Sequence, residues 1–134
     1  MLVHHDIWDY DNPPAPVLMD IERDGKVVPV LAQLGKTGWM FILNRRTGEP
    51  VFGVEERPVA KGDVPGEWYS PTQPFPLKPD PLARMSFSLE DMVTADDTTP
   101  AHAANCKALY DASGGFYNVG PFTPFLLHKE GTPP

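Results

Sequence analysis

The sequence has little cysteine and no long apolar run, and both absences limit what the protein can be. Cys106 is the single cysteine among 134 residues, so the chain cannot close an internal disulfide. A lone thiol does not make a zinc site, and we expect Cys106 to be a buried or half-buried small hydrophobic residue. No stretch approaches the roughly 18 apolar residues of a membrane span, and the N-terminus lacks the basic-then-apolar pattern of a signal peptide.

Basic residues are also scarce. The chain has 11 lysines and arginines against 18 acidic residues, and its formal net charge is -7. This charge has the wrong sign for neutralising phosphates or an anionic membrane surface, so we expect no nucleic-acid partner. Proline is abundant instead, with 17 among 134 residues, or about 13% against a typical value of roughly 5%. This excess disfavours a mainly helical bundle.

The first half of the sequence predicts antiparallel strands. Asp24-Gly25 suits a tight hairpin turn, and Gly35 and Gly38 bracket a second loop. Pro29 cannot donate to a ladder and is expected at an edge or a bulge. Four runs have strand length and strand composition: Ala15–Glu22, Val27–Leu34, Trp39–Asn44 and Pro50–Val54. Residues 1–57 therefore predict a four-stranded meander of the size of one propeller blade.

Residues 58–134 predict a proline-rich connection with one or two short helices, within the same domain. The segment from Pro58 to Pro81 is expected to be extended and irregular but ordered. Ser88 begins a short helical signature, and residues 100–113 predict a longer helix ended by Gly114-Gly115. Four residues recur within it at helical spacing: Ala103, Cys106, Leu109 and Tyr110. The apolar tail from Phe116 to His128 has strand-like composition. The fold class is therefore mainly β with minor α.

Two charged residues stand in loops that flank the first two expected strands. Asp9 precedes the first strand and Lys36 follows the second. An antiparallel pair brings these two loops to one edge of the sheet, so we expect Asp9 and Lys36 to face one pocket. A carboxylate can accept a proton from an alcohol or ligate a cation such as Ca²⁺, and a lysine can polarise an anionic or quinone oxygen. On spacing alone, such residues are more often a solvated turn pair than a functional site.

Two other motifs have simpler explanations. Residues 35–37 have the letters that end a phosphate-binding P-loop, but Val30 stands where that motif needs a glycine, and a strand-like run follows. His4 and His5 are neighbours on an extended segment, so their side chains point to opposite faces. Hydrogen bonding by one of them is therefore favoured over a metal ion shared by both.

Seven segments together resemble the pyrroloquinoline quinone (PQQ)-dependent dehydrogenases, nearest to the membrane-bound glucose dehydrogenase type. The likeness covers nearly the whole chain, so it is far more specific than any one motif. The segments are His4–Asp11, Lys36–Gly38, Phe41–Phe52, Val54–Val59, Ser70–Pro76, Ser113–Asn118 and Gly120–Pro124.

The resemblance implies roles for two residues and a set of partners. Asp9 matches the base that accepts the substrate's hydroxyl proton beside the quinone and its Ca²⁺ or Mg²⁺ ion, so Asp9 is also the candidate metal ligand. Lys36 matches the lysine that contacts the quinone oxygens. The implied cofactor is PQQ, the substrate a sugar or alcohol, and the electron acceptor a membrane quinone or a cytochrome. The implied location is the periplasm or the periplasmic face of the inner membrane.

The resemblance also implies an eight-bladed propeller, much longer than this chain, and the abrupt ends of the sequence agree with a fragment. We therefore expect the isolated chain to be inactive, because the other blades complete the cofactor site, and to self-associate through exposed strand edges. The alternative is a stand-alone β-sheet interaction module without catalysis, which would dock a partner on an aromatic surface of Trp39, Phe41 and Phe52.

Overall fold

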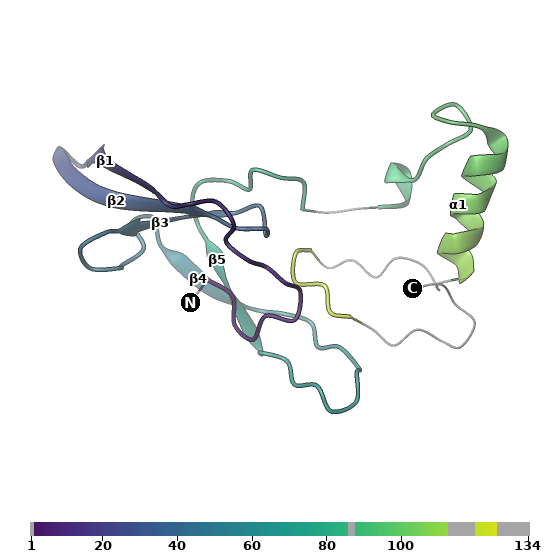
Figure 1. Ribbon diagram of the computed structural model, residues 1–134, viewed down its shortest axis with the longest axis horizontal. Helices are drawn as coiled ribbons and strands as arrows, with labels where there is room; N and C mark the ends of the chain where they lie inside the picture. The colour runs from purple at the N-terminus through teal and green to yellow at the C-terminus, as the bar shows by residue number, and fades with distance from the viewer. Residues whose placement is uncertain (1, 86–87, 113–119, 126–134) are drawn as a thin grey trace. The chain divides into compact units, whose positions relative to one another are not determined.

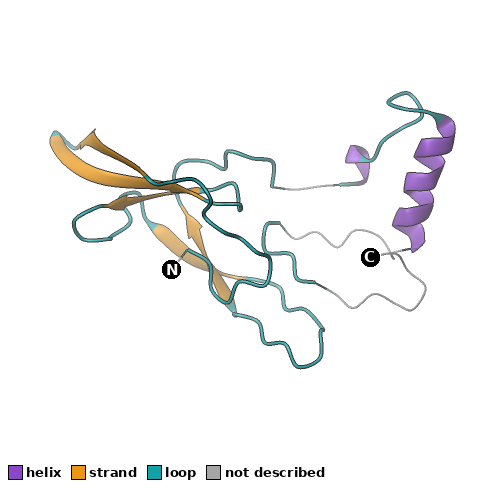
Figure 2. Cartoon of the chain, viewed as in Figure 1, coloured by secondary structure: helices purple, strands orange, loops and turns teal. Residues whose placement is uncertain are grey.

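The computed structural model describes residues 2–85, 88–112 and 120–125. These residues form two compact units. The first combines Met1–Val59 with Tyr69–Met85, and the second combines Ala60–Trp68 with Ser86–Pro134. Strands dominate the regular structure of the described residues, which also contain one α-helix and one 3-10 turn (Figure 2). The expected class, mainly antiparallel β with minor α, is therefore confirmed. The expected boundary after residue 57 stays a prediction.

A three-stranded antiparallel sheet in the order β1-β2-β3 forms the larger part of the first unit (Figure 1). Its strands are β1 (Val17–Arg23), β2 (Lys26–Leu34) and β3 (Met40–Asn44). Asp24 and Gly25 connect β1 to β2 with φ angles of 53° and 69°. A two-residue hairpin of this kind requires positive φ at both positions, which Asp and Gly tolerate best.

Pro29 lies at an edge position of the ladder, as expected, because it is paired with β1 on one side and lies beyond the last pair with β3 on the other. It pairs with Asp20 of β1, and the last pair between β2 and β3 joins Val30 to Asn44. On the β3 side, the Pro29 carbonyl accepts the N–H of Arg45 at 3.0 Å. The missing N–H of Pro29 therefore removes no bond from the β2–β3 ladder.

The fourth strand of the expected meander is wrong in position and in partner. Pro50 makes only an isolated bridge to Leu43, and Gly53, at φ 85°, turns the chain away. The next strand, β4 (Val54–Pro58), pairs instead with β5 (Thr72–Pro76) in a separate two-stranded sheet. Part of the proline-rich stretch is thus a strand rather than an irregular connection.

The core of the first unit lies between these strands. Val30, Ala32, Trp39 and Phe41 are buried, and the Trp39 and Phe75 rings lie 4.9 Å apart at an interplanar angle of 57°. Trp39 and Phe41 therefore cannot form the exposed aromatic surface of the interaction-module hypothesis, because packing within the unit already covers them.

The second unit contains the helical elements. The 3-10 helix η1 (Leu89–Asp91) begins at Ser88, whose backbone N–H donates to Asp91 Oδ2 at 2.6 Å. The helix α1 (Pro100–Ala112) follows Thr99, whose hydroxyl accepts the His102 N–H at 3.2 Å. Pro100 suits the first helical position because the backbone N–H that proline lacks would have no partner within the helix there. Within the described ranges, no helix has both the length and the apolar character needed to cross a membrane.

The expectations for this half are confirmed in part. Ala103, Cys106 and Tyr110 form the half-buried face of α1, whereas Leu109 is exposed. The expected glycine stop at 114–115 lies outside the described residues. Of the tail at 116–128, residues 120–125 are described, and they form a turn rather than a strand, with the Thr123 N–H donating to the Gly120 carbonyl at 3.2 Å.

Candidate functional site

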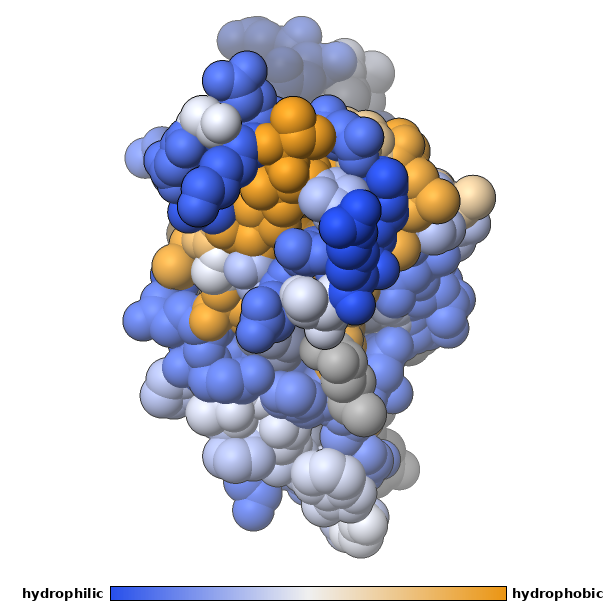
Figure 3. All heavy atoms as spheres, turned by 90° about the vertical axis from the view of Figure 1, so that its left-hand side faces the viewer, coloured by the Kyte–Doolittle hydropathy of each residue, from blue (hydrophilic) through white to orange (hydrophobic). Residues whose placement is uncertain are grey.

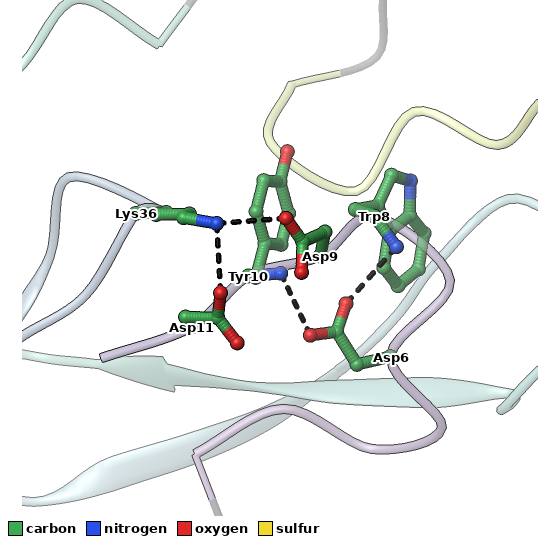
Figure 4. Close-up of polar contacts among 6 residues, drawn as sticks. All are labelled: Asp6, Trp8, Asp9, Tyr10, Asp11 and Lys36. Carbon is green, nitrogen blue, oxygen red and sulfur yellow. Dashed lines mark hydrogen bonds and ion pairs between the residues drawn. The ribbon is translucent and has the colours of Figure 1, made fainter. Parts of the chain in front are cut away.

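The segment before β1 is folded by one carboxylate. Asp6 accepts the backbone N–H of Trp8 at 3.0 Å and that of Tyr10 at 2.7 Å. An Asp side chain that bonds the backbone two and four residues onward replaces a backbone turn. Between these two anchored positions Asp9 takes φ 61°, a left-handed conformation that Asp adopts more readily than most residues. The bend carries the Asp9 side chain toward Lys36 (Figure 4).

The loop after β2 presents Lys36 to this segment. The Gly38 N–H donates to the Gly35 carbonyl at 3.0 Å, which closes a tight turn, and Gly38 has φ 77°. The Lys36 backbone N–H donates to the Asp11 carbonyl at 3.0 Å. This main-chain bond joins the loop directly to the segment that carries Asp9, although more than 20 residues separate them in the sequence.

Lys36 contacts two carboxylates at once. Its Nζ lies 2.8 Å from Asp9 Oδ2 and 2.8 Å from Asp11 Oδ2 (Figure 4). The expectation that Asp9 and Lys36 converge at one edge of the sheet is therefore confirmed. All three side chains are exposed, Asp9 most of all at 82%, so solvent screens the pairs and their contribution to stability is small.

Lys36 and Asp9 each stabilise the charged form of the other. The hydrogen bond from Lys36, followed by its positive charge, holds the pKa of Asp9 below its usual value. Hydrogen bonds to Asp11 and then to Asp9 raise the pKa of Lys36. Asp9 is thus ionised and able to accept a proton near neutral pH, but an ammonium that holds a carboxylate also opposes its protonation. The pair works as a base only if Asp9 can leave Lys36.

Two aromatic rings flank Asp9. Trp8 and Tyr10 stack with their centroids 5.7 Å apart and their planes at 14° (Figure 4). Both are half-buried, and burial, followed by the charge of Asp6, raises the pKa of the Tyr10 hydroxyl. The rings give the exposed carboxylate an apolar flank.

The described residues do not form a metal site by themselves. They contain no group of three or more His, Cys, Asp or Glu side chains able to hold a cation, and Lys36 already places a positive charge beside Asp9. A divalent cation at Asp9 would need oxygen ligands from other parts of the protein. The role of Asp9 as a metal ligand stays a prediction.

Histidine 4 makes hydrogen bonds, in line with the favoured interpretation. Its Nε2 lies 2.8 Å from Glu56 Oε1, and its backbone N–H donates to Gln73 Oε1 at 2.7 Å. Gln73 in turn donates from Nε2 to the His4 carbonyl at 2.6 Å. The N-terminal segment is thereby attached to β4 and β5.

Sequence reasoning did not assign a role to Asp11 or Gln73. Asp11 follows Asp9 by two residues, and alternate positions of an extended segment share a face, so this spacing was an available signal. For Gln73 no local signal exists, because its partner His4 is 69 residues away.

Comparisons with known proteins give one consistent family. A family model described as "PQQ: Glucose/ethanol/alcohol dehydrogenase, beta-propeller domain" matches residues 1–133. A quinoprotein glucose dehydrogenase of Escherichia coli is 49% identical over 73 residues, or 54% of this chain and 9% of the relative. A glycerol dehydrogenase large subunit of Gluconobacter thailandicus is 37% identical over 128 residues, or 94% and 16%.

A third relative is named for a different substrate. A quinate/shikimate dehydrogenase (quinone) of Acinetobacter baylyi is 36% identical over 133 residues, or 97% of this chain and 16% of the relative. The chain thus spans between 9% and 16% of the length of these curated relatives. No solved structure matches the chain.

Proposed function

Since the chain belongs to the family of the PQQ-dependent glucose, ethanol and alcohol dehydrogenase β-propeller domain, we propose that it forms part of an enzyme that oxidises a sugar or alcohol hydroxyl. The contact of Lys36 with Asp9 at 2.8 Å supports this proposal best, because it places a proton acceptor and a cation at one point. PQQ, when bound, supplies the two-electron acceptor that takes the hydride.

The residues of this chain then have separate tasks. The Asp9 carboxylate accepts the hydroxyl proton of the substrate while a hydride leaves the carbon that bears this hydroxyl, so the alcohol loses a proton and a hydride and becomes a carbonyl compound. The Lys36 ammonium binds cofactor oxygens, for which a cationic hydrogen-bond donor is chemically suited. Separation of the Asp9 carboxylate from Lys36, once the Lys36 ammonium binds the cofactor, would also release Asp9 as a base.

Two observations suggest the partners of this chain: the family to which it belongs, and the small share of its relatives' length that it covers. Further sheets of the propeller would cover the cofactor, and the electrons would pass to a membrane quinone or a cytochrome. The word "quinone" in the name of the Acinetobacter relative supports a quinone acceptor. We place the protein in the periplasm or at the periplasmic face of the inner membrane, as the resemblance implies, and Ca²⁺ or Mg²⁺ beside the cofactor.

The test uses the protein expressed from its complete reading frame. It is incubated with PQQ and Ca²⁺ or Mg²⁺, and reduction of an artificial dye is followed with glucose, glycerol, quinate and ethanol in turn. We expect PQQ-dependent reduction with at least one substrate and a loss of about 100-fold or more in kcat for Asp9→Asn, the usual effect of removing a general base. Activity that is independent of PQQ, or unchanged in Asp9→Asn, would contradict the proposal.

The 134-residue chain alone is expected to show no turnover under the same conditions, because water would reach the cofactor from the uncovered sides. Dye reduction above a blank without protein would contradict this.

The second candidate is an interaction module without catalysis. One observation favours it: an exposed apolar surface on the β1–β2 hairpin, where Leu18 and Val27 are 63% and 72% exposed. Figure 3 shows the molecule from the side at which this hairpin lies, with a hydrophobic area bordered by hydrophilic residues. The dye assay separates the two candidates, since a module gives no PQQ-dependent reduction.

A further inference from the structure

The two carboxylates that share Lys36 are not equivalent. Asp11 is joined to Lys36 twice, by its side chain at 2.8 Å and by its carbonyl, which accepts the Lys36 backbone N–H at 3.0 Å. Figure 4 joins Asp9 to Lys36 by one bond, between their side chains. Two bonds between the same two residues fix their relative position far better than one.

The segment of Asp11 and Asn12 also packs against Gly35, the residue before Lys36. A Cβ atom added at Gly35 would lie 2.8 Å from Asn12 Oδ1 and 3.7 Å from the Asp11 carbonyl oxygen. The main chain at Asp11 therefore lies within van der Waals contact distance of the space beside Gly35, and the Asn12 side chain fills that space. The Asp11 carboxylate starts from a fixed point relative to Lys36.

Asp9 has more freedom. The Asp9 side chain is 82% exposed, against 62% for that of Asp11. Asp9 lies in the bend between Trp8 and Tyr10, whose backbone N–H groups donate to Asp6 and not to the loop that carries Lys36. If Asp9 moves to the substrate, Lys36 keeps the Asp11 carboxylate as its counter-ion, and the site does not leave an ammonium without an anion.

We propose that Asp11 is the residue that positions Lys36, and that this second carboxylate lets Asp9 act on the substrate hydroxyl without releasing the Lys36 ammonium from the cofactor site. This inference rests on the proposed function, which supplies the substrate and the cofactor, but the positioning of Lys36 by Asp11 can be measured in the absence of both.

The first measurement uses cofactor-free protein from the complete reading frame. Lysines are acylated briefly at one fixed pH, and the labelling rate of each is read by peptide mass spectrometry. We expect Asp11→Asn to raise the labelling of Lys36 about threefold, within the range set by an exposed ion pair, and Asp9→Asn to raise it clearly less. Asp11→Glu, which keeps the charge on a flexible stem, should restore a rate close to that of the wild type.

A matched control lies on α1. Lys107 Nζ pairs with Asp111 Oδ1 at 2.5 Å, an exposed pair of the same type. Asp111→Asn should raise the labelling of Lys107 and leave that of Lys36 unchanged. Equal effects of Asp9→Asn and Asp11→Asn on Lys36, or a larger effect of Asp9→Asn, would overturn the inference.

The second measurement separates positioning from catalysis. The concentration of PQQ that gives half-maximal dye reduction is determined for each variant. Asp11→Asn should raise this half-maximal concentration about tenfold, a typical loss for one ionic hydrogen bond. The same substitution should change kcat by a smaller factor. Asp9→Asn should do the reverse, and Asp111→Asn should change neither value.

The two possible failures are distinguishable. If the wild type responds to PQQ but Asp11→Asn has the same half-maximal concentration, the inference is overturned and the proposed function stands. If the wild type does not respond to PQQ, the proposed function fails, and the labelling rates still decide which carboxylate holds Lys36.

Discussion

At Gly38, backbone conformation and packing both oppose a side chain. It has φ 77°, and an added Cβ would lie 2.9 Å from Ala83 Cβ and 3.1 Å from Met85 Cε. The backbone of this residue closes the turn that presents Lys36. The stability of the site loop is therefore sensitive to this one position.

Gly48 provides the matched control for a substitution at Gly38. It has φ 78° and nothing within 4 Å of an added Cβ, so Gly48→Ala should cost only the left-handed strain, about 1 kcal/mol. Gly38→Ala adds a steric clash with a rigid neighbour and should cost about 2 kcal/mol or more. Urea denaturation of both variants measures the difference, and equal midpoints would contradict the packing seen at Gly38.

Glu56 should make stability depend on pH. The hydrogen bond from His4 is the main cause that lowers the pKa of Glu56 from its usual 4.5, so the folded chain binds this proton less readily than the unfolded chain. The stabilising contribution is present above the usual pKa and is lost as the pH falls through the lowered one. The free energy of unfolding of the wild type minus that of Glu56→Gln should therefore be larger at about pH 6 than at about pH 3. A difference that does not change with pH would contradict this bond.

Of the two ion pairs of Lys36, the sequence predicts one. Asp9 and Lys36 could be paired from the sequence because a hairpin returns the chain to the edge from which it started. The sharing of Lys36 with Asp11 could not be predicted, since it depends on the bend at Asp6 and on the close approach at Gly35.

At the scale of elements, Gln73 of β5 connects the N-terminal segment to the second sheet. Its side chain is completely buried, and both halves of its amide bond the backbone of His4. The amide thus imitates one step of a strand ladder. It also holds the start of the segment that carries Asp9.

Gln73→Ala should destabilise the protein by about 1–3 kcal/mol, because it leaves a backbone donor and acceptor without their partner. Gln33→Ala removes a similar amide whose Nε2 donates to the Pro14 and Leu34 carbonyls from a half-buried position, and it should cost less. Thermal unfolding of the two variants compares these costs, and a larger loss in Gln33→Ala would be evidence against the anchoring role of Gln73.

The strand β5 explains why the second sheet could not be predicted. Pro74 and Pro76 have no N–H to donate to a ladder, but they stand at alternate positions, so their missing donors fall on one edge. The neighbouring bonds follow the same alternation, since Leu77 donates to the Gly53 carbonyl and Pro71 accepts from Val59. The first three strands were predictable to within about two residues because their turns and composition agree locally.

At the scale of the whole molecule, the outer edge of β1 has no strand partner among the described residues. Val17, Leu18 and Met19 of this strand are exposed. An exposed apolar edge favours pairing with another strand. The chain therefore carries a surface that suits either a further sheet of the same protein or a second copy.

The isolated chain should self-associate through this edge. Sedimentation velocity over a concentration series should show oligomers, and Leu18→Lys should shift the chain toward monomer, because a buried ammonium opposes the contact. Leu82→Lys, at an exposed leucine outside the strands, should leave the distribution unchanged. A clean wild-type monomer at high concentration would show that the edge does not drive association.

The central claim is that Asp9 and Lys36 lie at the cofactor of a PQQ-dependent dehydrogenase. A crystal structure of the protein from its complete reading frame with PQQ bound tests this claim most directly. The account predicts Lys36 Nζ within about 3.2 Å of a quinone oxygen, with the Asp9 carboxylate facing the substrate side of the ring and Asp11 still bonded to Lys36. PQQ bound with neither Asp9 nor Lys36 in contact with it would contradict the account.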